Sequence, residues 1–151
     1  MGNIAVEKKG TIAILWLDKA PANGISTEMS IELDTHVDSL ALDNEVKVVI
    51  LASKLEKIFS AGADATWFND LVEEYGVEGF PYEFEKFTNY FRRVCWKMHN
   101  SHQIYIAAIN GHCVAGGLEL VSACDFRFAA PGVKLGLPEL DIFGAIPSGG
   151  G

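Results

Sequence analysis

The chain has 151 residues, of which 49% are hydrophobic and 21% are charged, and its formal net charge is -8. This size and composition are those of one soluble globular domain and exclude disordered and fibrous proteins. The 12 basic residues form no cluster, so the charge argues against general nucleic-acid binding but leaves room for a locally held anionic ligand.

No apolar run approaches the roughly 20 residues that span a bilayer, and the N-terminal residues show no secretory pattern. We therefore expect a cytoplasmic protein without membrane contact. Cys95, Cys113 and Cys124 form no CxxC pair, which predicts buried free thiols rather than a disulfide or zinc framework. His99 and His102 have no clear third partner, so we expect no metal site.

The first third of the chain predicts the order strand, helix, strand. Residues 11–17 and 46–52 are apolar on both faces and rich in β-forming side chains, as buried strands are. Between them, the Pro-Ala-Asn-Gly sequence at residues 21–24 predicts a turn, and Ser26 is suited to cap a helix. Four apolar side chains recur on one face of that helix: Met29, Leu33, Val37 and Leu40.

Two helices are expected next, separated by helix breakers. Asp64 is suited to be the N-cap of the first helix. Gly76, Gly79 and Pro81 are expected to end it. A longer helix is expected over residues 82–98, with an apolar stripe that we interpret as core packing rather than as a cofactor contact: Phe84, Phe87, Phe91, Val94 and Met98.

The last third predicts short elements around a glycine-bearing loop. Residues 104–109 are expected to form a strand, followed by the loop at 111–117 and a short helix from about Leu118. Further strands are expected near residues 125–129 and 133–135.

Two glycine-bearing turns, at residues 61–63 and 116–117, each come just before an expected helix. Glycine adopts backbone angles closed to other residues, and the first NH groups of a helix have no partner within it. Two such NH groups aimed at one point stabilise the negative charge that develops on a carbonyl oxygen, such as that of a thioester. The alternative for each turn is a tight turn that only caps a helix.

Two glutamates follow these turns. Glu119 falls in the first turn of the short helix, where its alternative role is to complement the helix dipole. Glu139 follows Pro138 in a strongly apolar segment, where a carboxylate is either exposed or functional, because burying it unpaired is costly. Two carboxylates that face one pocket divide proton donation and proton removal. The chain has no GxxxxGK[ST], GxGxxG or GxSxG motif, which excludes P-loop, Rossmann and α/β-hydrolase proteins.

Taken in order, these segments resemble the enoyl-CoA hydratase/isomerase (crotonase) superfamily. The resemblance covers nearly the whole chain, and its motifs are specific in combination although each is weak alone. They lie at residues 22–24, 59–64, 108–111, 116–120, 124–127, 137–139 and 144–150. Ala115 departs from the pattern, because many members have a third glycine at that position.

The resemblance implies an α/β fold of the crotonase (ClpP/crotonase) type, a spiral of ββα units with two roughly perpendicular sheets. Residues 1–151 would form an acyl-CoA-binding core that is incomplete at its C-terminus, because family members continue into a helical segment absent here. That segment covers the acyl site and forms much of the trimer contact. We therefore expect a homotrimer or hexamer for the complete protein, and an inactive or impaired short form.

The resemblance also implies roles for individual residues. The NH groups of Ala63 and Gly116 would form an oxyanion hole around the thioester oxygen. Glu119 would activate water for attack on the β carbon, and Glu139 would exchange the α proton. The residues expected to contact the acyl-CoA are Ala22, Ala61, Gly62, Ala63, Asp64, Ala65, Thr66 and Gly116.

The function implied is that of an enoyl-CoA hydratase in fatty-acid β-oxidation, with no cofactor, since CoA is part of the substrate. The pair of glutamates favours a hydratase, because many isomerase relatives keep an acid only at the position of Glu139. An enoyl-CoA isomerase, or another enzyme that forms a thioester enolate, is the alternative within the family. The alternative from another class is a catalytically silent CoA-binding or subunit-interaction fragment.

Overall fold

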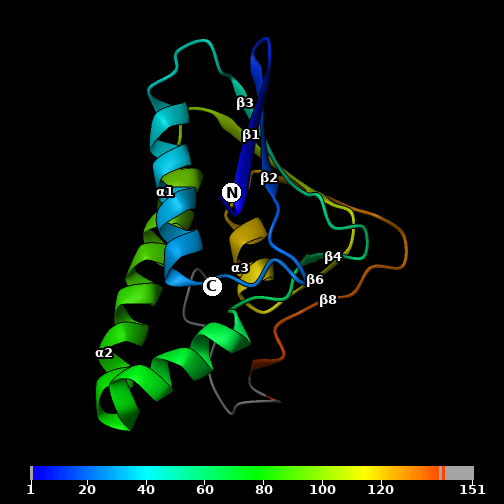
Figure 1. The fold of residues 1–151 in the computed structure, drawn as a ribbon. Coiled ribbons are helices and arrows are strands. Elements are labelled where there is room, and N and C mark those ends of the chain that lie inside the picture. The colour runs from blue at the N-terminus through cyan, green and yellow to red at the C-terminus, as the bar shows by residue number, and fades with distance from the viewer. Residues whose placement is uncertain (1, 140, 142–151) are drawn as a thin grey trace.

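A computed structural model describes residues 2–139 and 141, and its elements repeat in the order strand, strand, helix (Figure 1). The described elements are β1 (Ile4–Lys9), β2 (Ile12–Leu17), α1 (Thr27–Ala41), β3 (Val48–Ser53), β4 (Ile58–Ser60), α2 (Ala65–His99), β5 (Ile104–Ile109), β6 (His112–Val114), α3 (Gly116–Ser122), β7 (Phe126–Ala129) and β8 (Leu135–Gly136).

The strands form two sheets, and successive strand pairs contribute to both. The larger sheet has the order β1-β2-β3-β5-β7, with β1 antiparallel to β2 and the other pairs parallel. The smaller sheet has the order β4-β6-β8, and its pairs are parallel. Each of the pairs β3–β4, β5–β6 and β7–β8 therefore gives one strand to each sheet. This arrangement confirms the expected spiral of ββα units.

Helix α1 begins and packs as the sequence predicts. The Ser26 side chain accepts a hydrogen bond from the Met29 NH at 3.3 Å, which satisfies one of the NH groups that a helix start leaves unpaired. The predicted apolar face is buried: Met29, Leu33, Val37 and Leu40. Burial of each such side chain contributes about 1.5–3 kcal/mol to folding.

Helices α1 and α2 lie side by side along one side of the larger sheet and are joined by charged contacts (Figure 1). Asp34 of α1 pairs with Arg93, and also with Lys97 at 2.8 Å. Lys97 in turn reaches Asp38 at 2.6 Å. Burial alone would raise the pKa of Asp34, but its hydrogen bonds to Lys97 and Arg93 outweigh burial and hold the pKa below its ordinary value.

Helix α2 differs from the expected pair of separate helices. Gly76, at φ +67° and ψ 176°, marks a kink, but the chain is helical again through Gly79 and Pro81, so the prediction that those two residues break the helix is wrong. Pro81 lies five residues after the kink, so its missing NH removes one helical hydrogen bond from the second arm. The apolar stripe packs into or against the core as predicted: Phe84, Phe87, Phe91, Val94 and Met98.

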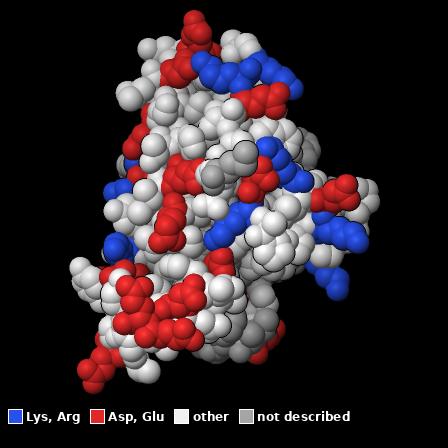
Figure 2. All heavy atoms as spheres, viewed as in Figure 1, with Lys and Arg blue, Asp and Glu red and all other residues white. Residues whose placement is uncertain are grey.

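Negative charge is concentrated on one part of the surface. Figure 2 shows acidic side chains gathered over the kinked part of α2, where Glu73, Glu74 and Glu78 are exposed. A phosphate-bearing ligand is repelled from such a surface, so we expect it to bind elsewhere. No helix of the described residues is both long and apolar enough to cross a bilayer.

The three cysteines are free and buried, as predicted. Burial raises the pKa of each thiol to about 12, so little thiolate exists at neutral pH. Strands β4 and β6 were not expected from the sequence, and β6 lies within the expected loop. Strand β8 begins two residues later than expected, since the observed strand is Leu135–Gly136.

Candidate active site

The segments expected to carry chemistry all follow strands of the smaller sheet. Ala63 follows β4, Gly116 and Glu119 follow β6, and Glu139 follows β8. Because β4, β6 and β8 are parallel neighbours, their carboxyl ends lie along one edge of the sheet. The fold thus brings to one edge all four residues to which the sequence analysis gave catalytic roles.

The two glycine-bearing turns are in direct contact. Gly62 has φ +88°, a backbone conformation that L side chains rarely adopt. A Cβ at this position would lie 2.5 Å from the Ala115 Cβ and 2.8 Å from the Gly116 N, both inside van der Waals contact. The close approach of the turns therefore requires glycine at position 62.

The hydrogen bonds of neighbouring carbonyl groups determine where the Ala63 and Gly116 NH groups point. The Gly62 carbonyl accepts from the Ile25 NH at 2.8 Å, and the Ala115 carbonyl accepts from the Leu118 NH at 2.8 Å. In a trans peptide the C=O and N–H bonds point in opposite directions. The Ala63 NH consequently points away from residue 25, and the Gly116 NH points away from the body of α3.

Neither of these two NH groups donates a hydrogen bond to any of the described residues. They are also close together, since a Cβ on Gly116 would lie 3.7 Å from the Ala63 N. The ring of Phe91 borders the same spot, with its Cζ 3.8 Å from that Cβ position. Two neighbouring donors beside an apolar ring are suited to hold an oxyanion, because the low local dielectric strengthens the interaction.

Glu119 lies in the first turn of α3 and is buried, with only 5% of its surface exposed. Its first-turn position also fits the alternative role of complementing the helix dipole, so its catalytic role stays a prediction. After burial, the charge of Glu119 is the next cause of the raised pKa of the Cys95 thiol in α2. Glu119 is thus a buried residue of α3, three positions after Gly116.

Glu139 is partly buried three residues beyond β8. Its Oε2 atom is shielded from solvent and accepts no hydrogen bond from the residues that the structure describes. The segment that leads to Glu139 lies next to the turn that precedes Glu119, because the Ala115 NH donates to the Gly136 carbonyl at 2.9 Å. An unpartnered buried carboxylate oxygen is costly and is typical of functional sites rather than of structural ones.

The other residues expected to contact substrate surround the first turn. The Ala61 NH donates to the Ala22 carbonyl at 3.0 Å, so these two residues are adjacent. Ala61, Ala65 and Thr66 are exposed, whereas Gly62 is buried. The structure thus places Ala22 beside the turn that carries the Ala63 NH, and a role of this set in acyl-CoA binding stays a prediction.

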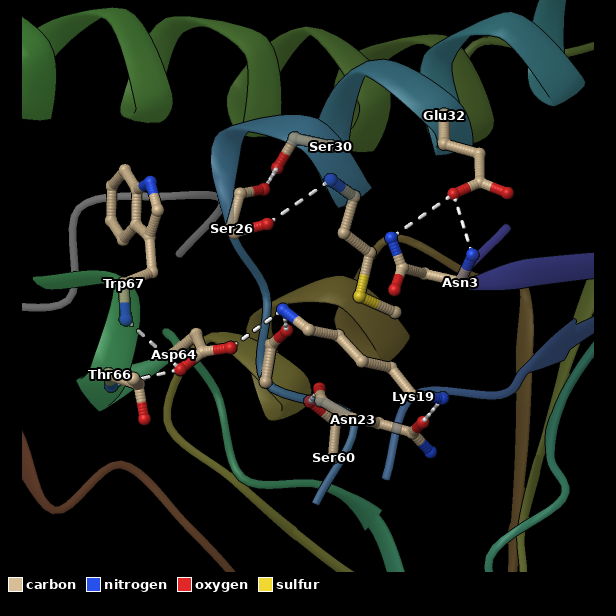
Figure 3. Close-up of polar contacts among 12 residues, drawn as sticks. Asn3, Lys19, Asn23, Ser26, Ser30, Glu32, Ser60, Asp64, Thr66 and Trp67 are labelled. Carbon is tan, nitrogen blue, oxygen red and sulfur yellow. Dashed lines mark hydrogen bonds and ion pairs between the residues drawn. The ribbon is translucent and has the colours of Figure 1, made fainter. Parts of the chain in front are cut away.

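Asp64 is engaged in structural contacts (Figure 3). Its carboxylate accepts from the NH groups of Thr66 at 2.9 Å and Trp67 at 3.3 Å, which confirms the predicted N-cap of α2. It also pairs with Lys19 at 2.6 Å, and that ammonium reaches the Gly24 carbonyl at 2.9 Å. Asp64 directly follows the Ala63 donor, and its carboxylate therefore anchors this part of the chain to the loop that follows β2.

Replacing Asp64 with Asn should make the stability of the fold depend less on pH in the acidic range. Burial raises the pKa of Asp64, but Lys19 and the helix NH groups lower it further, so the net pKa is depressed. A depressed folded pKa gives stability that is present above the unfolded value near 4 and is lost as pH falls through the folded pKa. We expect the free energy of unfolding of wild type to exceed that of Asp64→Asn by about 1–2 kcal/mol at neutral pH. This difference should become smaller toward pH 2.

Urea unfolding at several pH values measures this difference. Asp70→Asn on the exposed side of the same helix arm is the control, for which we expect a difference near zero throughout. If the difference in unfolding free energy between wild type and Asp64→Asn stays constant with pH, the depressed pKa of Asp64 does not contribute to stability.

Ala115 carries backbone strain at the start of α3. It has φ +53° and ψ -136°, where a side chain is disfavoured and glycine is not. This is the position where the resembled family often has a third glycine. Ala115→Gly should raise stability by about 1 kcal/mol, since relief of strain exceeds the entropy cost of glycine in the unfolded chain. Calorimetry should show a melting temperature higher by roughly 2–4 °C, and a lower one would refute the strain.

Three residues support this site without having been predicted as site residues from the sequence: Lys19, Asn23 and Ser60. Asn23 is fully buried at φ +48°, and its side chain bonds the Lys19 NH at 2.7 Å, the Ser53 Oγ at 2.8 Å and the Phe59 carbonyl at 2.8 Å. The Asn-Gly pair at residues 23–24 signals a positive φ, but nothing local indicates these distant partners.

Comparison with known proteins identifies the family. A family model described as enoyl-CoA hydratase/isomerase matches residues 7–151. The chain belongs to this family. The short-chain-enoyl-CoA hydratase of Clostridium acetobutylicum is 31% identical over 152 residues, which cover 100% of this chain and 55% of that protein. The mitochondrial enoyl-CoA delta isomerase 1 of Mus musculus is 32% identical over 90% of this chain and 46% of that protein.

Solved structures of the enoyl-CoA hydratase/isomerase family share the fold. An enoyl-CoA hydratase from Bacillus anthracis superimposes with a TM-score of 0.86 at 31% identity, over 98% of this chain and 55% of that chain. The expected crotonase-type fold is confirmed. The chain spans about half the length of these relatives. Since their names include both hydratases and an isomerase, family membership alone does not choose between the two reactions.

Proposed function

We propose that the protein carrying this chain is an enoyl-CoA hydratase, which adds water syn across the double bond of a trans-2-enoyl-CoA to give a 3-hydroxyacyl-CoA. The observation that supports this most is the meeting of two turns at one sheet edge, with the Ala63 and Gly116 NH groups close together and unbonded among the described residues. Two glutamates follow strands that end at the same edge.

The proposed reaction begins when the thioester oxygen accepts hydrogen bonds from the Ala63 and Gly116 NH groups. This polarises the conjugated double bond, because negative charge moves from the β carbon toward that oxygen. Glu119 removes a proton from water as the water oxygen bonds to the β carbon, which gives an enolate. Glu139 then delivers a proton to the α carbon. One water is consumed, and a final proton transfer returns both glutamates to their starting states.

Burial of the site strengthens each of these steps. Glu119 is nearly inaccessible to solvent, and Phe91 beside Gly116 is only 1% exposed. In such surroundings bulk water competes weakly for the donors. The same burial allows one activated water to react in preference to the solvent.

An enoyl-CoA isomerase is the second candidate, favoured by the 32% identity to the mouse delta isomerase. That reaction moves a proton between the α and γ carbons of the same enolate, so one acid suffices. The presence of Glu119 after the same sheet edge as Glu139 supports the hydratase instead, since hydration gives the second acid the task of activating water.

Assays of the full-length protein with crotonyl-CoA and with a 3-enoyl-CoA separate the two candidates. We expect crotonyl-CoA to lose its conjugated ultraviolet absorbance and to give 3-hydroxybutyryl-CoA by chromatography. Conversion of the 3-enoyl substrate to the 2-enoyl product, without hydration of either, would refute the hydratase and support the isomerase.

The wider setting belongs to the same proposal. We propose a cytoplasmic enzyme of fatty-acid β-oxidation that assembles as a trimer or hexamer and needs no cofactor. Assay of residues 1–151 beside the full-length protein tests the alternative of a silent CoA-binding or subunit-interaction fragment. Equal inactivity of both, with CoA-ester binding retained, would favour that alternative.

A further inference from the structure

Ser60, the last residue of β4, contacts both of the turns that hold the proposed oxyanion donors. It is fully buried and has two defined hydrogen bonds. Its hydroxyl donates to the Asn23 carbonyl at 2.9 Å and accepts from the Gly62 NH at 3.2 Å. Because a hydroxyl has one proton, donation to Asn23 leaves a lone pair for Gly62, and the side chain is held in one orientation.

The second turn rests directly on the same side chain. A Cβ at Gly117 would lie 2.7 Å from the Ser60 Cβ, 2.8 Å from its carbonyl oxygen and 2.9 Å from its Oγ. The glycine at 117 therefore packs against Ser60 without any intervening atoms. Ser60 thus touches the residue before the Ala63 donor and the residue after the Gly116 donor.

The partner of Ser60 is itself rigid. Figure 3 shows Ser60 next to Asn23, whose side chain is held by the main chain of Lys19 and by further buried contacts. Those contacts are made to the Ser53 Oγ at 2.8 Å and the Phe59 carbonyl at 2.8 Å. Because Ser60 is bonded to this fixed residue, its side chain restrains the positions of Gly62 and Gly117, which it contacts.

We propose that Ser60 is a positioning residue that sets the distance and alignment between the Ala63 and Gly116 NH groups. This inference rests on the oxyanion role proposed above for those two groups. Loss of the hydroxyl frees the Gly62 NH and leaves a gap beneath Gly117, so the two turns can shift relative to each other. Donors misaligned by a fraction of an ångström stabilise a developing oxyanion less well.

The test compares Ser60→Ala with Ser30→Ala in the full-length protein. Ser30 is a matched control, because it is fully buried and its hydroxyl donates to a main-chain carbonyl, that of Ser26, at 2.9 Å. This bond involves neither turn and none of the contacts that hold Asn23. The probe is butyryl-CoA with a ¹³C thioester carbonyl, whose infrared band moves to lower frequency when the oxygen accepts hydrogen bonds.

We expect the bound carbonyl band of Ser60→Ala to move back toward that of free butyryl-CoA, with kcat lowered about 10-fold and KM changed by less than about 3-fold. Ser30→Ala also removes a buried hydroxyl and its hydrogen bond to a main-chain carbonyl, but it should keep the wild-type band and kcat. A wild-type band and kcat in Ser60→Ala would overturn the inference, and so would equal effects of the two variants.

Two further outcomes also decide the matter. If Ser60→Ala does not fold, Ser60→Cys fills the site with a weaker hydrogen-bonding group, and an intermediate band supports the inference while an unshifted wild-type band overturns it. If wild type binds butyryl-CoA with the band of the free thioester, the oxyanion role itself is refuted. That result is distinct from a failure of Ser60 alone, in which wild type shows the shift and Ser60→Ala keeps it.

Discussion

Glu119→Gln and Glu139→Gln should each lower the kcat for crotonyl-CoA hydration by roughly 10²–10⁴-fold, the range of a lost general acid or base. Glutamine keeps the size of the side chain and its capacity for hydrogen bonds, but it cannot take up or release a proton at neutral pH. The dissociation constant for a CoA thioester should change little, because the Ala63 and Gly116 donors and the surface around residues 61–66 stay in place.

A matched control separates catalysis from helix stability. Glu28 also lies in the first turn of its helix, α1, but it is exposed, whereas Glu119 is buried. We expect Glu28→Gln to keep the kcat of the parent. If both active-site variants hydrate crotonyl-CoA as fast as the parent does, the proposed division of proton transfer is wrong. If only Glu139→Gln is impaired, a reaction with one essential acid is favoured.

Gly62→Ala should lower kcat/KM by at least about 10²-fold, comparable with the removal of an oxyanion donor. The new methyl group would lie 2.8 Å from the Gly116 N and 2.5 Å from the Ala115 Cβ, so the two turns must move apart. The φ of +88° adds a backbone penalty of about 1–3 kcal/mol. Both effects act on the peptide that carries the Ala63 NH.

Gly132→Ala is the control for the backbone penalty alone. Gly132 has φ +80°, but a Cβ there would have no described atom within 4 Å. We therefore expect a similar loss of stability from strain and no change in kcat/KM. The comparison is made by steady-state kinetics at a temperature where both variants are folded, as shown by circular dichroism. Equal kinetics for the two variants would show that close contact between the turns is not required.

The capped helices and the longer strands could be predicted from the sequence, because their signals are local. Ser26 and Asp64 both cap helices as expected, and the strands at residues 12–17, 48–53 and 104–109 fall within or beside the expected runs. In each case, a capping side chain or a run of β-forming residues favours the structure within its own segment.

The elements that were missed or misplaced depend on neighbours. Strands β4 and β6 have three residues each, too few for any periodicity, and they exist because they pair with each other and β6 pairs with β8. Gly79 and Pro81 are poor helix formers, yet α2 continues through them, since its aromatic side chains stack on one another: Phe80 on Phe84 and Phe87 on Phe91. Packing thus overrides local propensity.

For the candidate site, the sequence alone determined the chemical groups and their order along the chain: two glycine-bearing turns before helices, and two glutamates after them. Only the tertiary structure decided that Gly62 and Gly116 touch and that Ser60 contacts both turns. It also decided that the Ala63 and Gly116 NH groups donate to no described residue. The reason is that these relations join residues far apart in sequence. Their distances depend on strand pairing and register, which burial of the whole sheet determines and no local segment encodes.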